Sequence, residues 1–279
     1  MTQVLLTPMD LGLAALLLVL AAVLSFSFRL RLERTMPVAA VRMVVQLLLV
    51  GLVLKFVLEQ TSLALTAAIA VVMIAAAALE ATGRAAAPGL RPALLGLGSA
   101  TLLAVGLFAT LFAAAVVIRP DPWYAPRYVI PILGMVLGNA LTAVGLVFQS
   151  MVTMVGRERR AIEARLALGE TRHQALAPLL REALATALTP ILNAMAVAGV
   201  VSLPGMMTGQ VIAGVDPIEA AKYQIVIMFV LAGAVAVAAV AAGLGSVLLL
   251  TDRRDRLRLD RIAGHTTGAT TDGLASSGR

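Results

Sequence analysis

YQIVIMFVLAGAVAVAAVAAGLGSVLLL, residues 223–250, contains no charged side chain. A helix needs about 20 consecutive apolar residues to cross the hydrocarbon core of a bilayer, and this run is longer. The rest of the chain has the same character, because 60% of its 279 residues are hydrophobic and only 13% are charged. A soluble domain carries roughly a quarter charged residues. The chain is therefore predicted to be an all-α, polytopic membrane protein.

Six further stretches are apolar and long enough, or nearly long enough, to span a membrane. The predicted spans are 11–28, 38–58, 63–79, 93–118, 129–153, 186–203 and 223–250. Arginines cluster after the first span, within 157–181 and at the end of the last span, which predicts that these segments are cytoplasmic. The expected topology has seven transmembrane helices with the N-terminus outside and the C-terminus inside. Residues 1–258 form one transmembrane domain, and the small, polar residues 259–279 form a disordered tail.

The composition excludes several classes of function. The net charge of +7 comes from short basic clusters between apolar runs, which indicates membrane orientation and no nucleic-acid partner. The absence of cysteine excludes disulfides, thiolate metal sites and cysteine catalysis. His173 and His265 both lie in predicted cytoplasmic segments, so no histidine metal site is expected within the membrane. No span contains a pair of carboxylates, so hydrolytic chemistry has no support.

The cytoplasmic stretch 157–185 has apolar residues at three- and four-residue steps, which predicts helices divided near Gly169. One interpretation is a surface helix on the anionic inner leaflet, and the other is a helix that docks into a partner subunit. EARLALG, from Glu163 to Gly169, resembles the E-A-A-x-x-x-G loop by which ABC permeases contact their ATPase subunits, with Arg165 in place of the second alanine. Glu163, Arg165 and Gly169 are therefore the candidate ATPase-coupling residues.

The chain has no site of its own for ATP hydrolysis. Its only lysines are Lys55 and Lys222, and neither follows a glycine-rich loop, so the phosphate-binding G-x-x-x-x-G-K-[ST] motif is absent. The chain is not expected to be an enzyme or to bind a cofactor. If transport is ATP-driven, ATP and Mg bind to a separate ATPase subunit that docks from the cytoplasm.

Polar side chains within the predicted spans are candidates for a substrate pathway, because they are costly in lipid. Arg42 and Gln46 lie one turn apart in the second span. Arg42 is close enough to the cytoplasmic end to snorkel, whereas Gln46 lies a turn deeper. Asn139 is an amide in the middle of the fifth span. Beside it Gly134 and Gly138 form a G-x-x-x-G pair, which favours helix packing within the chain or against a second copy.

The segment SLPGMMTGQVIAGVDP, residues 202–217, interrupts the apolar pattern between the last two spans. Its Pro204–Gly205 pair is expected to end the sixth span, and broken backbone at membrane depth is tolerated only beside protein or a water-filled cavity. Met206, Met207 and Gln210 are therefore predicted to lie at or beside such a cavity. The two methionines suit either adaptable packing or ligation of a soft metal, and both interpretations stay open.

Three blocks of the sequence resemble FetB-type permeases. They are RMVVQLLLVG (Arg42 to Gly51), GMVLGNALTA (Gly134 to Ala143) and the segment from Ser202 to Ile225, and the similarity extends over roughly residues 30–250. These permeases are membrane subunits of a bacterial ABC system linked to iron export, with plant relatives linked to aluminium tolerance. Glu170, in GETRH, stands where the family pattern has alanine.

The resemblance implies a permease subunit of an ATP-driven exporter for iron, another metal or a metal complex. It would act as a homodimer with a separate ATPase subunit, in the bacterial cytoplasmic (inner) membrane. ATP binding to the partner would move the 157–185 helices and switch access around a cavity lined by the second, fifth and sixth spans.

Two other classes of function compete with this one. An ion-coupled secondary transporter or channel would need no ATPase, but it usually places an ionisable residue near mid-membrane, and none lies deeper than Arg42. A membrane-anchored structural or regulatory protein would leave the broken segment 202–217 and Gln46 unexplained.

Overall fold

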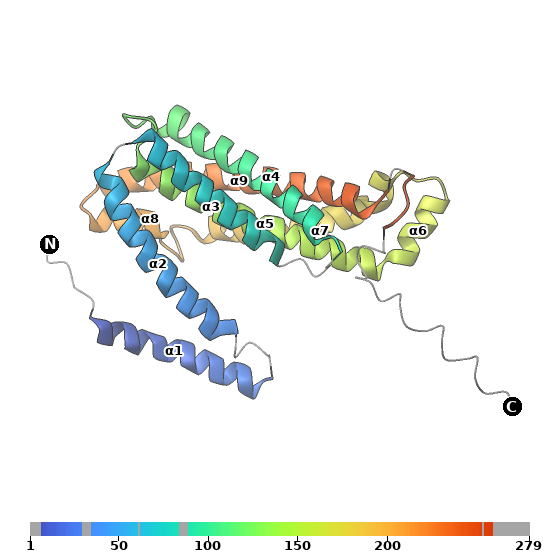
Figure 1. The fold of residues 1–279 in the computed structure, drawn as a ribbon, viewed down its shortest axis with the longest axis horizontal. Helices are drawn as coiled ribbons and strands as arrows, with labels where there is room; N and C mark the ends of the chain where they lie inside the picture. The colour runs from blue at the N-terminus through green and yellow to red at the C-terminus, as the bar shows by residue number, and fades with distance from the viewer. Residues whose placement is uncertain (1–6, 30–34, 61, 84–88, 253, 259–279) are drawn as a thin grey trace. The chain divides into compact units, whose positions relative to one another are not determined.

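The computed structural model of the chain describes residues 7–29, 35–60, 62–83, 89–252 and 254–258. It divides into two compact units, an N-terminal unit, Met1–Thr61, and a C-terminal unit, Ser62–Arg279. The N-terminal unit contains α1 (Pro8–Ser27) and α2 (Thr35–Glu59). The C-terminal unit contains the helices α3 (Leu63–Gly83), α4 (Arg91–Leu111), the π-helix η1 (Phe112–Ile118), α5 (Pro126–Arg157), α6 (Arg159–Ala167), α7 (Arg172–Val197), α8 (Gly205–Ile212) and α9 (Pro217–Leu250) (Figure 1).

The predicted all-α class and the seven spans are confirmed. Within the described residues, seven helical stretches are long and apolar enough to cross a membrane: Met9–Ser27, Thr35–Leu58, Leu63–Glu80, Arg91–Ile118, Pro126–Arg157, Arg172–Val197 and Pro217–Leu250. The short third span is among them. The orientation of the termini stays a prediction, and the expected tail at 259–279 lies outside the described residues.

The sixth span differs from its prediction at both ends. Residues 172–197 form one continuous helix, so the second helix expected in the cytoplasmic stretch and the span expected at 186–203 are one element. It begins at a capping box, in which Gln174 N donates to Thr171 Oγ1 (3.4 Å) and Thr171 N donates to Gln174 Oε1 (3.0 Å). It ends at Val197, before the Pro204–Gly205 pair that was expected to stop it.

Gly199 is the reason for the earlier end of α7. Its φ of +84° lies in the left-handed region, where a residue without Cβ is favoured, and its N–H donates to Ser202 O (2.8 Å). Pro204 then serves as the N-cap of the next helix, α8.

The N-terminal unit is an apolar helix pair. Thr7 and Asp10 form a capping box at the start of α1, with Thr7 N donating to Asp10 Oδ2 (2.8 Å) and Asp10 N to Thr7 Oγ1 (3.4 Å). Leucine, valine and phenylalanine side chains are exposed around both helices. A helix that is apolar on all sides is suited to lipid contact, so the surface of this unit matches its predicted membrane location.

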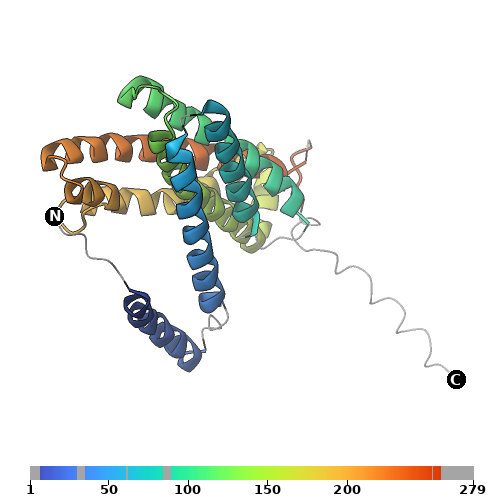
Figure 2. The same cartoon turned by 60° about the vertical axis from the view of Figure 1, so that its left-hand side comes forward.

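Helices α5 and α9 form the centre of the C-terminal unit. Helix α5 packs against α3, α4, α7 and α9, and α9 also contacts α4, α7 and α8. The paired course of α7 and α9 is visible in Figure 2. The fully buried side chains concentrate on α5, where Val136, Ala140, Val144 and Phe148 follow one another at helical spacing.

Small residues allow α9 to approach its neighbours closely. Ala242 is fully buried. A Cβ atom added to the adjacent Gly243 would lie 2.5 Å from Leu180 Cδ1 of α7. At Gly245 an added Cβ would lie 2.5 Å from both Cδ atoms of Leu97 of α4. Close helix packing through small residues is the main source of stability available inside a bilayer, so these positions hold α9 in the bundle.

A valine at Gly245 is expected to destabilise the C-terminal unit, because its side chain must displace Leu97. Overpacking of this kind costs about 1–3 kcal/mol. The matched control is Gly233→Val on the same helix, where an added Cβ meets nothing within 4 Å. The apparent melting temperature of each purified variant in detergent gives the comparison, and equal melting temperatures for the two would contradict the packing role of Gly245.

Candidate functional site

The interrupted segment between α7 and α9 folds into two turns around the short helix α8. Gly199 makes the first turn, and Gly214, with a φ of +94°, makes the second. Asp216 caps α9, because its Oδ1 accepts hydrogen bonds from Ile218 N (2.9 Å) and Glu219 N (3.2 Å). The segment is therefore ordered by its glycines and by this cap.

A cavity of about 450 Å³ lies where the end of α7, helix α8 and the first turns of α9 meet. None of its lining residues in the described part of the chain carries a charge. The lining consists of Met195, Ala198, Gly199, Pro204, Met207, Ala221, Gln224, Ile225, Met228 and Phe229. Three thioethers and one amide are thus set in an otherwise apolar wall, and this is the pattern of a small-molecule site with few polar groups.

Gln224 is the main polar group of the cavity wall. Its side chain is on α9 and the residue is only 8% exposed. Its Oε1 has no hydrogen-bond partner among the described residues. A buried acceptor without a partner costs about 1–3 kcal/mol, so a ligand that donates a hydrogen bond here would recover part of that cost.

Met206, Met207 and Gln210 of α8 were predicted to lie at or beside one cavity, but their surroundings differ. Met207 lines the cavity together with Gln224. Met206, the neighbouring residue, packs against the hydrophobic core instead. Gln210 is outside the cavity lining, and its Oε1 also lacks a partner within the described chain.

The other predicted pathway residues lie elsewhere in the fold. Arg42 and Gln46 are on α2, in the N-terminal unit. Asn139 is on α5 and is not part of the cavity lining. Its Nδ2 donates to Met135 O (2.8 Å), so the partner that a mid-span amide requires is supplied by its own helix.

The predicted packing glycines of α5 have different surroundings. A Cβ added at Gly134 would lie 3.2 Å from Met73 Cε of α3, which marks a close approach inside the C-terminal unit. An added Cβ at Gly138 would meet nothing within 4 Å. Gly138 therefore lies on an open face of α5.

The stretch predicted to be cytoplasmic forms an elbow between α6 and α7. Ile162 of α6 is 1% exposed and fixes the short helix to the bundle. The chain then turns at Gly169, whose φ is +96°. Leu168, just before the turn, is 86% exposed, an unusual position for a leucine outside the predicted spans.

An open groove of about 610 Å³ accompanies the elbow. Its lining residues are Arg165, Leu168, Gly169, Glu170, Gln174, Ala177, Pro178 and Arg181. Two of the three predicted coupling residues, Arg165 and Gly169, thus lie in the groove. Glu163 is exposed outside it, and its Oε1 accepts from Arg159 Nε (2.9 Å) in an i,i+4 ion pair.

Sequence reasoning missed Gln224, Met195 and Met228. Gln224 had a signal, because it is an amide at the start of the apolar run 223–250. The two methionines had none, because a methionine in an apolar span has the same pattern whether it packs or faces a cavity.

The donors of the cavity are chemically neutral and mostly soft. Thioether sulfur suits soft metals, whereas ferric iron and aluminium prefer oxygen ligands. In the described residues no group of three or more histidine, cysteine, aspartate or glutamate side chains could hold a metal ion. The cavity is therefore suited to an apolar molecule or a metal complex. Its shape and the amide of Gln224 would bind such a molecule.

Seven apolar helices, an apolar cavity at one end of α7 and a polar elbow at the other define a polytopic α-helical membrane protein. The model of the family described as "Uncharacterised protein family (UPF0014)" matches residues 8–248, and the chain belongs to this family.

Relatives from bacteria and plants share most of the chain. The probable iron export permease protein FetB of Escherichia coli is 35% identical over 80% of this chain and 83% of its own length. The UPF0014 membrane protein STAR2 of rice is 37% identical over 81% of this chain and 78% of its own length. A UPF0014 membrane protein of Synechocystis is 43% identical, over 49% of this chain and 51% of its own length. No solved structure matches the chain.

Replacing Gln224 by leucine is expected to leave the folded protein as stable as the wild type, or more stable by about 1 kcal/mol, because it removes an acceptor without a partner. Gln149→Leu, at an exposed glutamine of α5, is the matched control, expected within about 0.5 kcal/mol of the wild type. Thermal melting in one detergent measures both. A loss of several degrees for Gln224→Leu alone would mean that its amide is satisfied in the native protein.

Proposed function

We propose that this chain is the membrane-spanning permease subunit of an ATP-driven exporter for iron, another metal or a metal complex. Its 35% identity to a protein named as a probable iron export permease supports the transport class and the cargo. The geometry of α7 supports the way in which the transport would be driven.

The observation that carries the proposal is the continuity of α7 from the elbow to the cavity. The elbow residues Leu168 and Gly169 directly precede the helix, and Met195 near its other end lines the cavity. The helix has 26 residues, which corresponds to about 39 Å at 1.5 Å per residue. A displacement of the elbow would be carried along this one element, which bends most easily at Pro178 and Pro190, and would change the cavity wall.

The elbow has the chemistry expected of a docking site for an ATPase subunit. An exposed leucine beside an open groove offers an apolar anchor, and Arg165, Glu170 and Arg181 supply a charged rim. Interfaces between proteins commonly combine an apolar centre with a polar rim. The partner would bind ATP and Mg, because this sequence has no phosphate-binding loop.

Open faces on α5 and α7 support a second copy of the chain as a further partner. Gly138 of α5 is exposed, as are Thr189 and Asn193 of α7. Small residues on membrane helices usually face another helix, because they allow close packing. Polar residues usually face another helix or a water-filled path, because lipid offers them no hydrogen-bond partner. A homodimer would cover these faces.

The lining of the cavity favours a complexed cargo. Its neutral wall offers no carboxylate to a trivalent ion, so iron would pass as a chelate or another oxygen-coordinated complex. Met207 is the one predicted soft ligand that faces the cavity. Arg42, Gln46, Asn139, Met206 and Gln210 stay predicted pathway residues. The bacterial cytoplasmic membrane, with the C-terminus inside, stays the proposed location.

Leu168→Asn is expected to weaken binding of the partner ATPase at least tenfold and to abolish permease-dependent ATP hydrolysis, because it removes the apolar anchor of the elbow. Leu203→Asn is the matched control, since this leucine is also exposed but lies beyond the opposite end of α7. The measurement is ATP hydrolysis by the purified partner with each variant in lipid, with and without candidate metals.

Each outcome of that assay decides one part of the proposal. Hydrolysis that needs the permease and rises with one metal supports both the ABC class and the metal cargo. Hydrolysis that needs the permease and ignores every metal keeps the class and rejects the cargo. Failure of the wild-type permease to bind or stimulate the partner rejects the ABC class and favours an ion-coupled transporter, whereas full activity of Leu168→Asn rejects the docking role of the elbow alone.

A cysteine at Asn193 is expected to form a disulfide between two copies under mild oxidation, because the α7 face that carries it would lie at the dimer interface. The native chain has no cysteine, so the background is zero. Val237→Cys, on an exposed apolar face of α9, is the control and is expected to stay monomeric on a non-reducing gel. Equal crosslinking of the two variants would argue against an interface at α7.

A further inference from the structure

The chain does not leave the bundle directly after α9, but folds back on itself. Helix α9 ends at Leu250, and Arg258 N donates to Leu250 O (2.9 Å) at the far side of a tight turn. Asp252 N also donates to Arg256 O (2.9 Å). The described residues 251–252 and 254–258 therefore form a short hairpin, the C-terminal hairpin, at the end of the last span.

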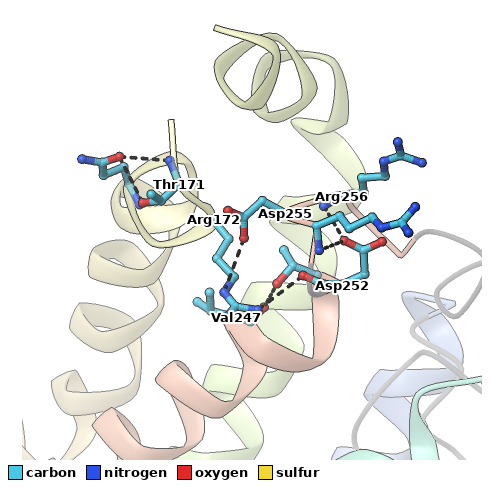
Figure 3. Close-up of polar contacts among 9 residues, drawn as sticks. Thr171, Arg172, Val247, Asp252, Asp255 and Arg256 are labelled. Carbon is cyan, nitrogen blue, oxygen red and sulfur yellow. Dashed lines mark hydrogen bonds and ion pairs between the residues drawn. The ribbon is translucent and has the colours of Figure 1, made fainter. Parts of the chain in front are cut away.

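The hairpin is stabilised by the carboxylate of Asp252. Its Oδ1 accepts hydrogen bonds from Arg254 N (2.7 Å) and Arg256 N (2.8 Å). Asp252 and Arg256 are labelled in Figure 3. The hydrogen bond from the Arg256 amide, together with that of Arg254, holds the pKa of Asp252 below its ordinary value. The Asp252 carboxylate therefore stabilises the turn by accepting these two backbone hydrogen bonds.

Arg172 ties the hairpin to the start of α7. Its Nη1 donates to Asp252 O (3.3 Å), and its Nε lies 3.5 Å from Asp255 Oδ1 (Figure 3). The two segments are 80 residues apart in the sequence. Beside their contact lies an open cavity of about 510 Å³ that the transport proposal does not use.

Four arginines line this cavity. Its walls are formed by Arg172, Leu248, Thr251, Asp252, Arg254, Arg256 and Arg258. Among the described residues, no carboxylate lies within ion-pairing distance of Arg254, Arg256 or Arg258. Asp252 is the one carboxylate among the lining residues and interacts with the charges of Arg254 and Arg256, so the wall keeps a net positive charge that attracts an anion.

The geometry favours a phosphate-bearing anion. Guanidinium groups present planar, forked donors that match phosphate oxygens and keep their charge at any physiological pH. Arg172 already contacts Asp252 and Asp255, and the other three guanidinium groups of the lining fit a phosphate group with its substituent better than a single carboxylate.

The location of the cavity selects a lipid headgroup over a free phosphate. Leu248 belongs to the last turn of the α9 span, is half exposed and forms part of the wall, so the cavity has an apolar edge toward the membrane. Thr251, the first residue after the helix, is buried beside it. Basic pockets at the ends of transmembrane helices are suited to anionic lipids, whose acyl chains continue along the apolar edge.

We propose that the arginine-lined cavity between the C-terminal hairpin and the start of α7 binds the phosphate headgroup of an anionic phospholipid. The negative charge of the bound headgroup offsets part of the positive charge of Arg254, Arg256 and Arg258, and the headgroup attaches the hairpin, and through Arg172 the beginning of α7, to the membrane surface.

The test is a titration of the purified full-length protein in neutral detergent with short-chain phosphatidylglycerol. Parallel titrations use short-chain phosphatidylcholine and inorganic phosphate. Wild-type protein is expected to bind phosphatidylglycerol and to bind it at least tenfold more tightly than the other two probes. Binding is expected to weaken as salt is raised, because the contact is electrostatic.

The diagnostic variant is Arg254→Gln combined with Arg256→Gln, expected to weaken phosphatidylglycerol binding at least tenfold. Its fold is expected to persist, because only the backbone atoms of these residues hold the turn together. Arg157→Gln with Arg160→Gln removes the same charge from exposed positions outside the cavity and is expected to bind like the wild type. Melting temperatures of both double variants report on folding.

Three results would overturn the proposal. Equal binding of phosphatidylcholine would remove the headgroup selectivity, and equal loss in the two double variants would reduce the effect to overall charge. Inorganic phosphate binding as tightly as phosphatidylglycerol would assign the cavity to a free phosphate.

Discussion

The close approach of α9 to its neighbours is the constraint on which the C-terminal unit depends. In lipid the hydrophobic effect does not drive one apolar helix toward another, so association relies on packing of small residues and on hydrogen bonds. Gly243 and Gly245 bring α9 against Leu180 of α7 and Leu97 of α4, where a methyl group would already collide. With α9 held in this way, both of its ends are placed beside the ends of α7.

The two ends of the α7–α9 pair carry opposite chemistry. At one end, glycine turns and the short helix α8 leave an apolar cavity whose polar group is the amide of Gln224. At the other end, the C-terminal hairpin and the start of α7 enclose a cavity lined by arginines. A neutral wall tolerates a cargo without binding it as an ion, whereas a charged wall retains an anion. The neutral cavity is therefore suited to the passage of a cargo. The arginine-lined cavity is suited to the attachment of the chain to an anionic lipid.

The elbow and the arginine cavity both involve the first turns of α7, which gives this helix a central place in the proposed cycle. Leu168 and Gly169 precede its N-terminus, and Arg172 in its first turn holds the hairpin. A partner that moves the elbow would act on a helix whose start is also tied to the end of α9. The attachment of the hairpin to the membrane surface would then oppose this movement of the start of α7. The displacement of the elbow would be transmitted along the helix axis.

Local patterns made part of this architecture predictable. Hydropathy predicted the existence of all seven spans, because each run is long enough, or nearly long enough, to cross a bilayer whatever it packs against, although the bounds of the sixth differ. The division near Gly169 was also predictable, since glycine interrupts helical periodicity locally. The end of the sixth span was predicted wrongly, at Pro204, because a proline and a glycine are both helix terminators and the sequence does not rank Gly199 above Pro204.

The sequence by itself determined the membrane class, the number of spans and the segments rich in donors or charge. Only the tertiary structure decided which of those donors share a space: Met207 with Gln224 but not with its neighbour Met206, and Arg172 with arginines more than 80 residues away. The physical reason is that hydropathy and turn propensity are properties of a few consecutive residues. Which cavity or neighbour a side chain contacts depends on how helices that are distant in sequence pack around it.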